Sequence, residues 1–326
     1  MPKLRFTQYI CFVLLLFCLV VQPGWDHIQQ LDLSVPVQAL EQKEDLPQLI
    51  TKLTVPIYTD AEPAETTFPN VTATAVYIMD RKSGSILFQK NAHELRYPAS
   101  TAKMMTALVA RRLYSSSDIL TVQEEAFSTG STVGFHIGEQ LTVEQLLYAL
   151  LIPSGNDAAF ILANHHPEGY SGFISAMNSL AQELRLTQTT FHNPSGLDNA
   201  TQMTTARDLA LIANEVMKDA ELRKIVLHKQ YTIHDVQNAY THELQNTDEL
   251  LGNVEGVVGI KTGTTDLAGE NLVTEVDRNG REVIIVVLGS HDRFSDSKQI
   301  INWVFSHYSW KNIDAQVDTS QNNLLH

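Results

Sequence analysis

The sequence predicts an α+β fold, in which an antiparallel sheet is flanked by helices and a helical region is inserted between the first strands and the last. Three observations predict it. Strand-like patterns occur just after residue 72 and return after residue 257, residues 115–215 are mostly helical in pattern, and an amphipathic segment follows the last strands. We therefore expect the first and last strands to meet in one sheet.

The composition limits the class of protein. The chain has 326 residues, of which 44% are hydrophobic, and this is enough for one large core with appendages. Its formal net charge is −14, and this acidic balance argues against nucleic-acid binding, which needs a basic surface. Both cysteines, Cys11 and Cys18, lie in an apolar N-terminal run, so we expect no disulfide in the folded domain.

Residues 1–25 are typical of an export signal, because Lys3 and Arg5 precede an apolar run from Tyr9 to Val21. The run is shorter than the roughly 20 residues that a membrane-spanning helix needs. No convincing cleavage site follows it directly, so a cleaved signal peptide and a retained N-terminal membrane anchor both stay open. In either case the positive end stays inside, and we expect an extracytoplasmic protein, secreted or anchored to the cell membrane by its N-terminus.

Three further regions follow this segment. Residues 26–68 are rich in proline and in acidic residues, which favours a linker. Residues 69–310 contain the regular patterns of apolar residues and are predicted to form the main folded domain. Residues 311–326 are predicted to be a polar tail.

The strands are predicted from runs of β-branched and aromatic residues. They lie at Ala75–Asp80, Ile86–Gln89, Val257–Thr262, Asn271–Val276 and Glu282–Leu288. Glycine-containing turns at residues 82–85 and 277–280 predict two β-hairpins. Helices are predicted from apolar spacing and capping residues. They lie at Thr142–Ile152, at Asp157–Asn164, at Gly172–Leu186, from Thr204 or Thr205 onward, and from about Asp296 to Tyr308.

Ser100 and Lys103 are the candidate nucleophile and base. Pro98 suits the approach to a helix, and helix formers continue through Arg112, so Ser100 is expected at or near a helix N-terminus. Lys103 then follows one turn later on the same face, where its amine can take the proton of the serine hydroxyl. The N–H groups and dipole of the helix start favour a developing oxyanion.

A lysine can act as the base only in its neutral form. The pKa of an ordinary lysine is about 10.4, so only about one in several thousand is neutral at pH 7. Burial or a nearby cation must therefore lower the pKa of Lys103, and Lys261 is the natural candidate for that cation.

Ser154 and Asn156 lie two residues apart in a turn that follows an apolar helix, so their side chains can point to the same side. Asn156 offers a donor and an acceptor to a peptide amide, and Ser154 can relay a proton toward a leaving nitrogen. Taken alone, Ser-Gly-Asn is also typical of an ordinary loop after a helix.

The third motif is Lys261-Thr262-Gly263-Thr264, at the end of a strand pattern. Gly263 leaves room for a substrate backbone to lie along the strand, and Lys261 with the hydroxyls of Thr262 and Thr264 offers a cation and donors to a carboxylate. Arg293 follows the last strand and either helps to bind that carboxylate or is a surface arginine.

In this order, the three motifs match the Ser-x-x-Lys, Ser-x-Asn and Lys-Thr-Gly set of penicillin-interacting serine enzymes. Over roughly residues 70–308 the chain resembles the D-alanyl-D-alanine carboxypeptidase family, the low-molecular-mass penicillin-binding proteins. Further segments that carry the resemblance are Phe191–Leu197, Thr204–Ala210, Asn246-Thr247 with Leu250-Leu251, Gly259–Gly263 and Ala268-Gly269.

The resemblance implies a β-lactamase/DD-peptidase-like fold and a serine DD-peptidase that removes the terminal D-Ala from peptidoglycan stem peptides. The reaction would pass through an acyl-Ser100 ester that water cleaves, and β-lactams would acylate the same serine. The implied oxyanion hole is formed by the backbone N–H groups of Ser100 and Thr264. We expect no cofactor, metal ion or nucleic-acid partner, and a membrane contact only through the N-terminal segment.

Three residues depart from the family pattern: Val258, Arg185 and Asp248 stand where Asp, Gly and Asn are common. None lies in the three motifs, so they bear on the substrate preference rather than on the reaction. Because the chain ends soon after the closing helix, a DD-endopeptidase that cleaves peptidoglycan cross-links stays open as the alternative.

Two other classes of enzyme are disfavoured. A β-lactamase needs a glutamate to activate the deacylating water, and no Glu-x-x-Leu-Asn-like segment follows Asn156. A metal enzyme is disfavoured because His165 and His166, the densest histidine pair, would point about 100° apart on a helix.

Overall fold

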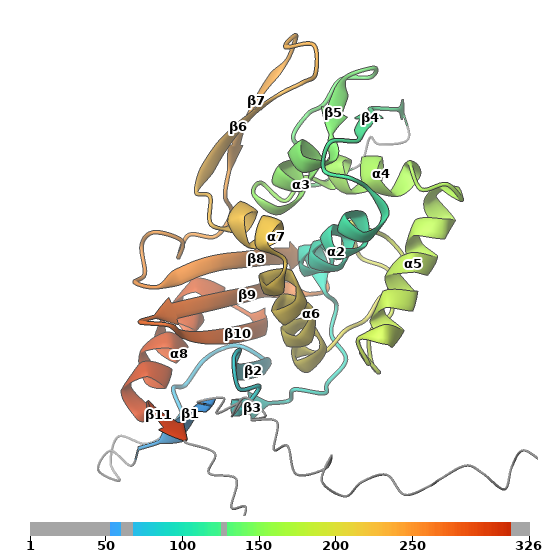
Figure 1. The fold of residues 1–326 in the computed structure, drawn as a ribbon. Coiled ribbons are helices and arrows are strands. Elements are labelled where there is room, and N and C mark those ends of the chain that lie inside the picture. The colour runs from blue at the N-terminus through green and yellow to red at the C-terminus, as the bar shows by residue number, and fades with distance from the viewer. Residues whose placement is uncertain (1–52, 60–67, 125–128, 314–326) are drawn as a thin grey trace, which may run out of the picture. The chain divides into compact units, whose positions relative to one another are not determined.

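The structure is a computed structural model that describes residues 53–59, 68–124 and 129–313 (Figure 1). The predicted export signal and most of the predicted linker and polar tail lie outside the described residues. None of the described helices combines the length and the hydrophobicity that a membrane span requires.

A five-stranded sheet, in which every neighbouring pair is antiparallel, forms the centre of the fold, with the order β3-β2-β10-β9-β8. Its strands are β2 (Ala75–Asp80), β3 (Ile86–Lys90), β8 (Val257–Thr265), β9 (Gly269–Arg278) and β10 (Arg281–Ser290). The first strands therefore meet the last ones: β2 pairs with β10, and Tyr77 lies opposite Val286. This confirms the predicted α+β topology.

The sheet is buried on both faces because its central strands alternate between two apolar layers. In β10, Ile284, Val286 and Leu288 belong to one core cluster. Val283, Ile285 and Val287 belong to the other. Successive side chains of a strand point to opposite faces, so a continuous apolar run is what a strand covered on both sides requires.

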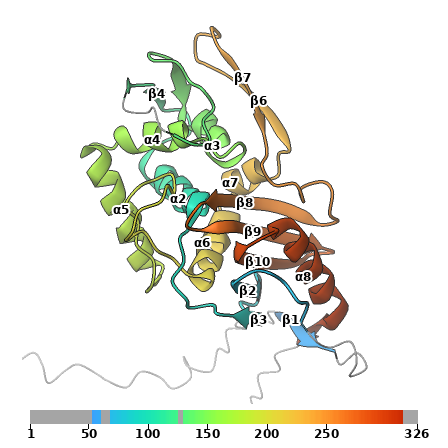
Figure 2. The same cartoon turned by 180° about the vertical axis from the view of Figure 1, so that it is seen from behind.

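Helices cover the two faces of the sheet (Figures 1 and 2). On one face, α8 (Arg293–His307) contributes Ile300, Ile301 and Val304 to the core. On the other face, α6 (Ala206–Lys218) contacts β10 and β2 and belongs to the helical region. The rest of that region consists of α2 (Lys103–Leu113), α3 (Val143–Leu151), α4 (Asn156–Asn164), α5 (Gly169–Glu183) and α7 (Ala220–Val226).

Polar side chains fix where several of these helices begin. Thr142 is the N-cap of α3 and forms a capping box with Gln145. Thr205 is the N-cap of α6 and accepts a hydrogen bond from the N–H of Asp208 at 3.1 Å. Because such caps are local in sequence, the starts of these two helices agree with the prediction to within a few residues.

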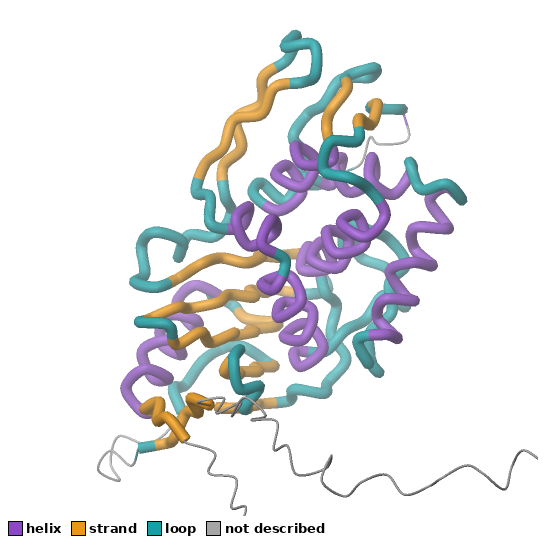
Figure 3. The backbone as a smooth tube through the Cα atoms, viewed as in Figure 1, coloured by secondary structure: helices purple, strands orange, loops and turns teal. Residues whose placement is uncertain are grey.

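Three two-stranded sheets were not predicted from the sequence (Figure 3). They pair β4 (Ile119–Thr121) with β5 (Gln140–Thr142), β6 (Gln230–His234) with β7 (Thr241–Gln245), and β1 (Leu53–Tyr58) with β11 (Tyr308–Ile313). The first strand of the last pair falls in the predicted linker, and the second extends into the predicted polar tail. Pro56 lies within β1 opposite Trp310, which a strand at an edge tolerates.

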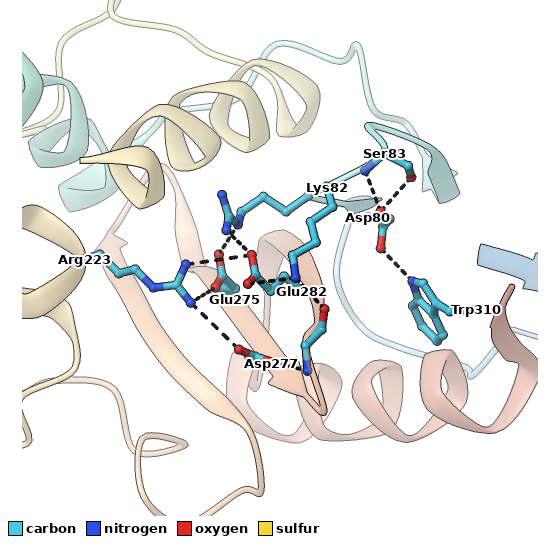
Figure 4. A network of polar contacts seen from close by, with 10 residues as sticks. Asp80, Lys82, Ser83, Arg223, Glu275, Asp277, Glu282 and Trp310 are labelled. Carbon is cyan, nitrogen blue, oxygen red and sulfur yellow. Dashed lines mark hydrogen bonds and ion pairs between the residues drawn. The ribbon is translucent and has the colours of Figure 1, made fainter. Parts of the chain in front are cut away.

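A network of charged side chains ties α7 to the sheet (Figure 4). Glu275 on β9 has a fully buried side chain, 3.1 Å from Nε of Arg81 and 3.2 Å from Nη2 of Arg223. Arg223, on α7, also lies 3.8 Å from Glu282 and 3.9 Å from Asp277. Burial raises the pKa of Glu275 from its ordinary 4.5 to about 7, although the two arginines oppose the shift.

Candidate active site

Ser100 lies in a single 3-10 turn, η3 (Ala99–Ala102), that continues directly into α2. The backbone before it is strained, because Ala99 has a φ of 48°. Two contacts hold this turn. The side-chain amide of Asn271, on β9, donates to the carbonyls of Tyr97 and Pro98 at 3.0 and 3.2 Å. Gly196 packs so closely that a Cβ there would lie 1.8 Å from the carbonyl oxygen of Ala99.

Lys103 is completely buried beside Ser100. Its Nζ lies 2.7 Å from Oγ of Ser100, 2.6 Å from Oδ1 of Asn156 and 2.8 Å from the carbonyl oxygen of Ser195. Burial, followed by the charge of Lys261, lowers the pKa of Lys103 well below its ordinary value, and Asp157 opposes the shift. The amine is therefore placed and tuned to accept a proton from the serine hydroxyl.

Asn156 begins α4 and connects the second motif to the first. Its Oδ1 accepts a hydrogen bond from Nζ of Lys103, and its Nδ2 donates to the carbonyl of Thr129 at 2.6 Å. Ser154 occupies the turn between α3 and α4 with a φ of 66° and is 5% exposed. Among the described residues its hydroxyl has no hydrogen-bond partner, so it remains available to a substrate.

The third motif lies on β8, an edge strand of the sheet, and passes directly against Ser100. A Cβ at Gly263 would lie 2.9 Å from the backbone nitrogen of Ser100, so a side chain there would collide with the turn. Thr262 Oγ1 lies 2.6 Å from Oγ1 of Thr247. Because β8 pairs with β9 on one side only, its other side can accept an extended peptide as an added strand.

Two cations lie along this strand. Lys261 is 1% exposed, and its Nζ donates to the carbonyl of Thr262 at 3.1 Å. Burial and the charge of Arg293 lower the pKa of Lys261 to about 7, while Asp248 opposes the shift. Arg293, at the start of α8, donates to the carbonyl of Gly263 at 3.1 Å and contacts Oγ1 of Thr264. The structure thus places Arg293 beside the third motif.

The backbone carbonyl of Ser195 is a group at the site that was not identified from the sequence. Asn193 shapes its loop, since its Oδ1 accepts hydrogen bonds from the N–H groups of Ser195, Gly196 and Leu197 at 3.2, 2.8 and 3.1 Å. The signal in the sequence is the Asn-x-x-Gly spacing, which is typical of a turn around an Asn side chain. It predicts the turn but not its position next to Lys103.

The histidine pair considered for a metal site has a local structural role. Nδ1 of His165 lies 2.8 Å from the carbonyl oxygen of Ile161, and its Nε2 accepts from the N–H of Thr121 at 3.3 Å. Nδ1 of His166 accepts from the N–H of Glu168 at 3.1 Å. Both imidazoles therefore satisfy backbone groups around the end of α4.

Comparison with known proteins gives a consistent result. A family profile described as D-alanyl-D-alanine carboxypeptidase matches residues 61–292. The chain is 35% identical over 256 residues to the D-alanyl-D-alanine carboxypeptidase DacC of Escherichia coli, covering 74% of this chain and 63% of that one. It is 34% identical over 260 residues to a D-alanyl-D-alanine carboxypeptidase of a Streptomyces species, covering 74% of this chain and 89% of that one.

Solved structures agree. The crystal structure of a Streptomyces DD-transpeptidase has a TM-score of 0.70 and 33% sequence identity, and the match covers 74% of this chain and 99% of that one. A putative penicillin-binding protein homologue from Mycobacterium tuberculosis has a TM-score of 0.71 and 28% identity, over 78% of this chain and 99% of that one.

Proposed function

The chain belongs to the D-alanyl-D-alanine carboxypeptidase family, and on that premise we propose that it is a serine-type D-Ala-D-Ala carboxypeptidase that trims peptidoglycan stem peptides and is acylated by β-lactams. The observation that carries the proposal is the buried Lys103 amine, with its lowered pKa, 2.7 Å from the hydroxyl of Ser100. A hydroxyl beside a neutral amine is what acyl transfer through a serine ester requires.

In the acylation step, Oγ of Ser100 attacks the carbonyl carbon of the penultimate D-Ala while the neutral amine of Lys103 accepts the hydroxyl proton. The negative charge that develops on the carbonyl oxygen is stabilised by the backbone N–H groups of Ser100 and Thr264. The bond to the terminal D-Ala nitrogen then breaks, and Ser154 relays the proton held by Lys103 to that nitrogen, which leaves Lys103 neutral again. Asn156, held between Lys103 and Thr129, orients the peptide amide.

The substrate binds as an extended strand along the open side of β8. Its terminal carboxylate is held by the Lys261 ammonium, the Arg293 guanidinium and the hydroxyls of Thr262 and Thr264. Gly263 supports this arrangement, because it lets the strand approach Ser100 closely enough to bring the scissile bond to the hydroxyl.

In the second half of the reaction, water attacks the acyl-Ser100 ester and gives a proton to the neutral amine of Lys103, which passes that proton to Oγ of Ser100 as the ester bond breaks. A β-lactam follows the first half of the same route, since its ring carbonyl takes the place of the scissile peptide carbonyl.

Peptidoglycan lies outside the cytoplasm, so the proposal places the enzyme in the extracytoplasmic compartment. The export signal expected at residues 1–25 supports this placement, and the segment serves either as a cleaved signal peptide or as an N-terminal membrane anchor.

Digestion of purified muropeptides followed by mass spectrometry tests the proposal. We expect pentapeptides to lose one D-Ala while cross-linked dimers stay intact, and Ser100→Ala to leave all species unchanged. Splitting of dimers without loss of the terminal D-Ala would replace the carboxypeptidase assignment with a DD-endopeptidase. An unchanged profile with the wild-type protein would contradict both.

A further inference from the structure

Glu270 is a partly buried carboxylate beside the third motif that the mechanism above does not use. It lies near the start of β9, opposite Thr264 of β8 on one side and opposite Ser290 of β10 on the other. Its Oε2 accepts a hydrogen bond of 3.0 Å from the backbone N–H of Arg293. Residues that lie directly opposite each other in a sheet project from the same face, so Glu270 and Thr264 share one face of the sheet.

This hydrogen bond satisfies a group that the helix itself leaves unpaired. Arg293 is the first residue of α8, and the first N–H groups of a helix have no acceptor within it. The N-cap residue Asp292 accepts from the N–H of Ser295 at 2.9 Å, so its side chain serves a different group. A carboxylate is also a stronger acceptor than a neutral oxygen. Glu270 therefore fixes the first residue of α8 to the sheet.

The position of Arg293 decides where its guanidinium lies. Its Nη1 donates to the carbonyl of Gly263 at 3.1 Å and contacts Oγ1 of Thr264, whereas its Nη2 makes no hydrogen bond within the described residues. The guanidinium also forms no ion pair of 4 Å or less in the described part of the chain, since the carboxylate of Glu270 binds the backbone N–H instead. Arg293 thus keeps its charge and a free donor for the carboxylate of a ligand.

The next residue of β9, Asn271, points to the opposite face and holds the turn that carries Ser100. Its amide donates to the carbonyls of Tyr97 and Pro98 at 3.0 and 3.2 Å. Successive side chains of a strand project to opposite faces. Two consecutive residues of one central strand therefore fix the nucleophile from one face and Arg293 from the other. In the substrate, the scissile carbonyl and the terminal carboxylate belong to adjacent residues, so the spacing between the serine and the arginine has to match.

We propose that Glu270 is a positioning residue that fixes Arg293 beside Thr264 and thereby sets the preference of the site for peptides with a free C-terminal carboxylate. This inference rests on the proposed function. Without the hydrogen bond from its N–H, the first residue of α8 can shift, and the guanidinium then meets the substrate carboxylate in poorer geometry. That contact is made both in the bound substrate and in the transition state, so its loss raises KM more than it lowers kcat.

The test compares two substrates of the purified full chain, a peptide that ends in D-Ala-D-Ala with a free carboxylate and the same peptide with a C-terminal amide. Release of the terminal residue, followed by mass spectrometry, gives kcat and KM for each. For Glu270→Ala we expect KM for the free-acid peptide to rise about tenfold with kcat nearly kept, so that the ratio of kcat/KM between the two peptides falls about tenfold. Glu270→Gln keeps an oxygen for the N–H of Arg293, and its ratio should stay within about threefold of the wild type. Glu270→Val, whose β-branched side chain suits a strand, replaces the alanine variant if that one does not fold.

Further variants show whether Glu270 acts through Arg293. Arg293→Gln should lower the ratio by itself, and adding Glu270→Ala to it should lower the ratio no further, because the group that Glu270 positions is gone. Glu243→Ala is the matched control, because it removes a glutamate from an exposed position of β7, and it should leave the ratio unchanged. A folded Glu270→Ala or Glu270→Val protein with the wild-type ratio overturns the inference, since a structural defect lowers kcat/KM for both peptides alike. A further fall in the double variant, or a Glu270→Gln protein that loses the preference as fully as Glu270→Ala, also overturns it. A wild-type protein that cleaves neither peptide contradicts the proposed function instead.

Discussion

At the scale of single residues, Lys103 has the most demanding role, because it must be both fixed beside Ser100 and neutral to act as a base. A buried lysine with acceptors at 2.6, 2.7 and 2.8 Å is held in one position. Burial and the charge of Lys261 favour its neutral form. The two effects together explain how an ordinary amine can serve as a base near neutral pH.

Replacing Lys103 with arginine tests this role. The guanidinium keeps a positive charge and can still donate hydrogen bonds, but it cannot be deprotonated and so cannot act as a base. We expect acylation by a fluorescent penicillin to slow by about 100- to 10,000-fold. Lys90→Arg is the control, because Lys90 lies on β3 and donates to the carbonyl of Ala73, so this variant should label normally. Labelling of Lys103→Arg at the wild-type rate would show that another group is the base.

The sequence predicts residues of this kind well when their spacing is local. Ser100 and Lys103 are one helical turn apart, and the structure confirms their contact. The carbonyl of Ser195 could not be predicted, because 92 residues separate it from Lys103 and only tertiary packing brings them together. Arg293 is an intermediate case, since its position after the last strand was predicted but its contact with Gly263 was not.

At the scale of elements, the turn before Ser100 depends on the loop that contains Gly196. Gly196 has a φ of 86°, and a Cβ there would lie 1.8 Å from the carbonyl oxygen of Ala99. The backbone of this loop and the strained turn at Ala99 therefore pack against each other only because Gly196 has no side chain.

Gly196→Ala should displace the turn that carries Ser100. We expect it to lower the free energy of unfolding by more than about 2 kcal/mol, because the φ penalty adds to a steric clash, and to slow penicillin labelling strongly. Gly84→Ala is the matched control: Gly84 has a φ of 72° but nothing within 4 Å of an added Cβ, so we expect only about 1 kcal/mol and normal labelling. Chemical denaturation and labelling kinetics measure both; equal effects of the two substitutions would contradict this account.

Secondary structure was predictable where the signals were local. Capping residues such as Thr142 and Thr205 and the Asn279-Gly280 turn fixed the ends of helices and one hairpin. The pair of β1 and β11 could not be predicted, because it joins segments about 250 residues apart. Stacking of Tyr58 on the ring of His307 and its edge contact with Tyr308 help to hold this pair in place.

At the scale of the whole molecule, the network around Glu275 makes stability depend on pH. In the folded protein the pKa of Glu275 is raised from 4.5 to about 7, because burial outweighs the attraction of Arg81 and Arg223. Between these two pH values the folded state binds more protons than the unfolded state, so this group lowers stability as the pH rises through that range.

Glu275→Gln should remove this dependence, because the amide has nearly the same shape and does not titrate. Relative to this variant, the wild type should lose at most about 3 kcal/mol of unfolding free energy between pH 5 and pH 8. Urea unfolding at the two pH values measures the difference, and the exposed Glu255→Gln is the control, for which we expect no comparable change. A wild type that gains stability over this range relative to Glu275→Gln would mean that the arginines outweigh burial.

The order of the elements along the chain predicted the topology of the whole domain. Strands occur both before and after the helical region, so a single sheet can contain them only if the first strands lie beside the last ones. The position of β8 against Ser100 was not predictable in detail, because it depends on how α2, β9 and the Gly196 loop pack together. The predicted division into signal or anchor, linker, catalytic domain and tail stays a prediction.

The central claim is that Ser100 is the residue that becomes acylated. The most direct measurement is mass spectrometry of the protein after incubation with benzylpenicillin, first intact and then as proteolytic peptides. We predict one penicilloyl group per chain, located on the peptide that contains Ser100, and none in a folded Ser100→Ala variant. An adduct on another residue, or labelling that persists in Ser100→Ala, would contradict the account.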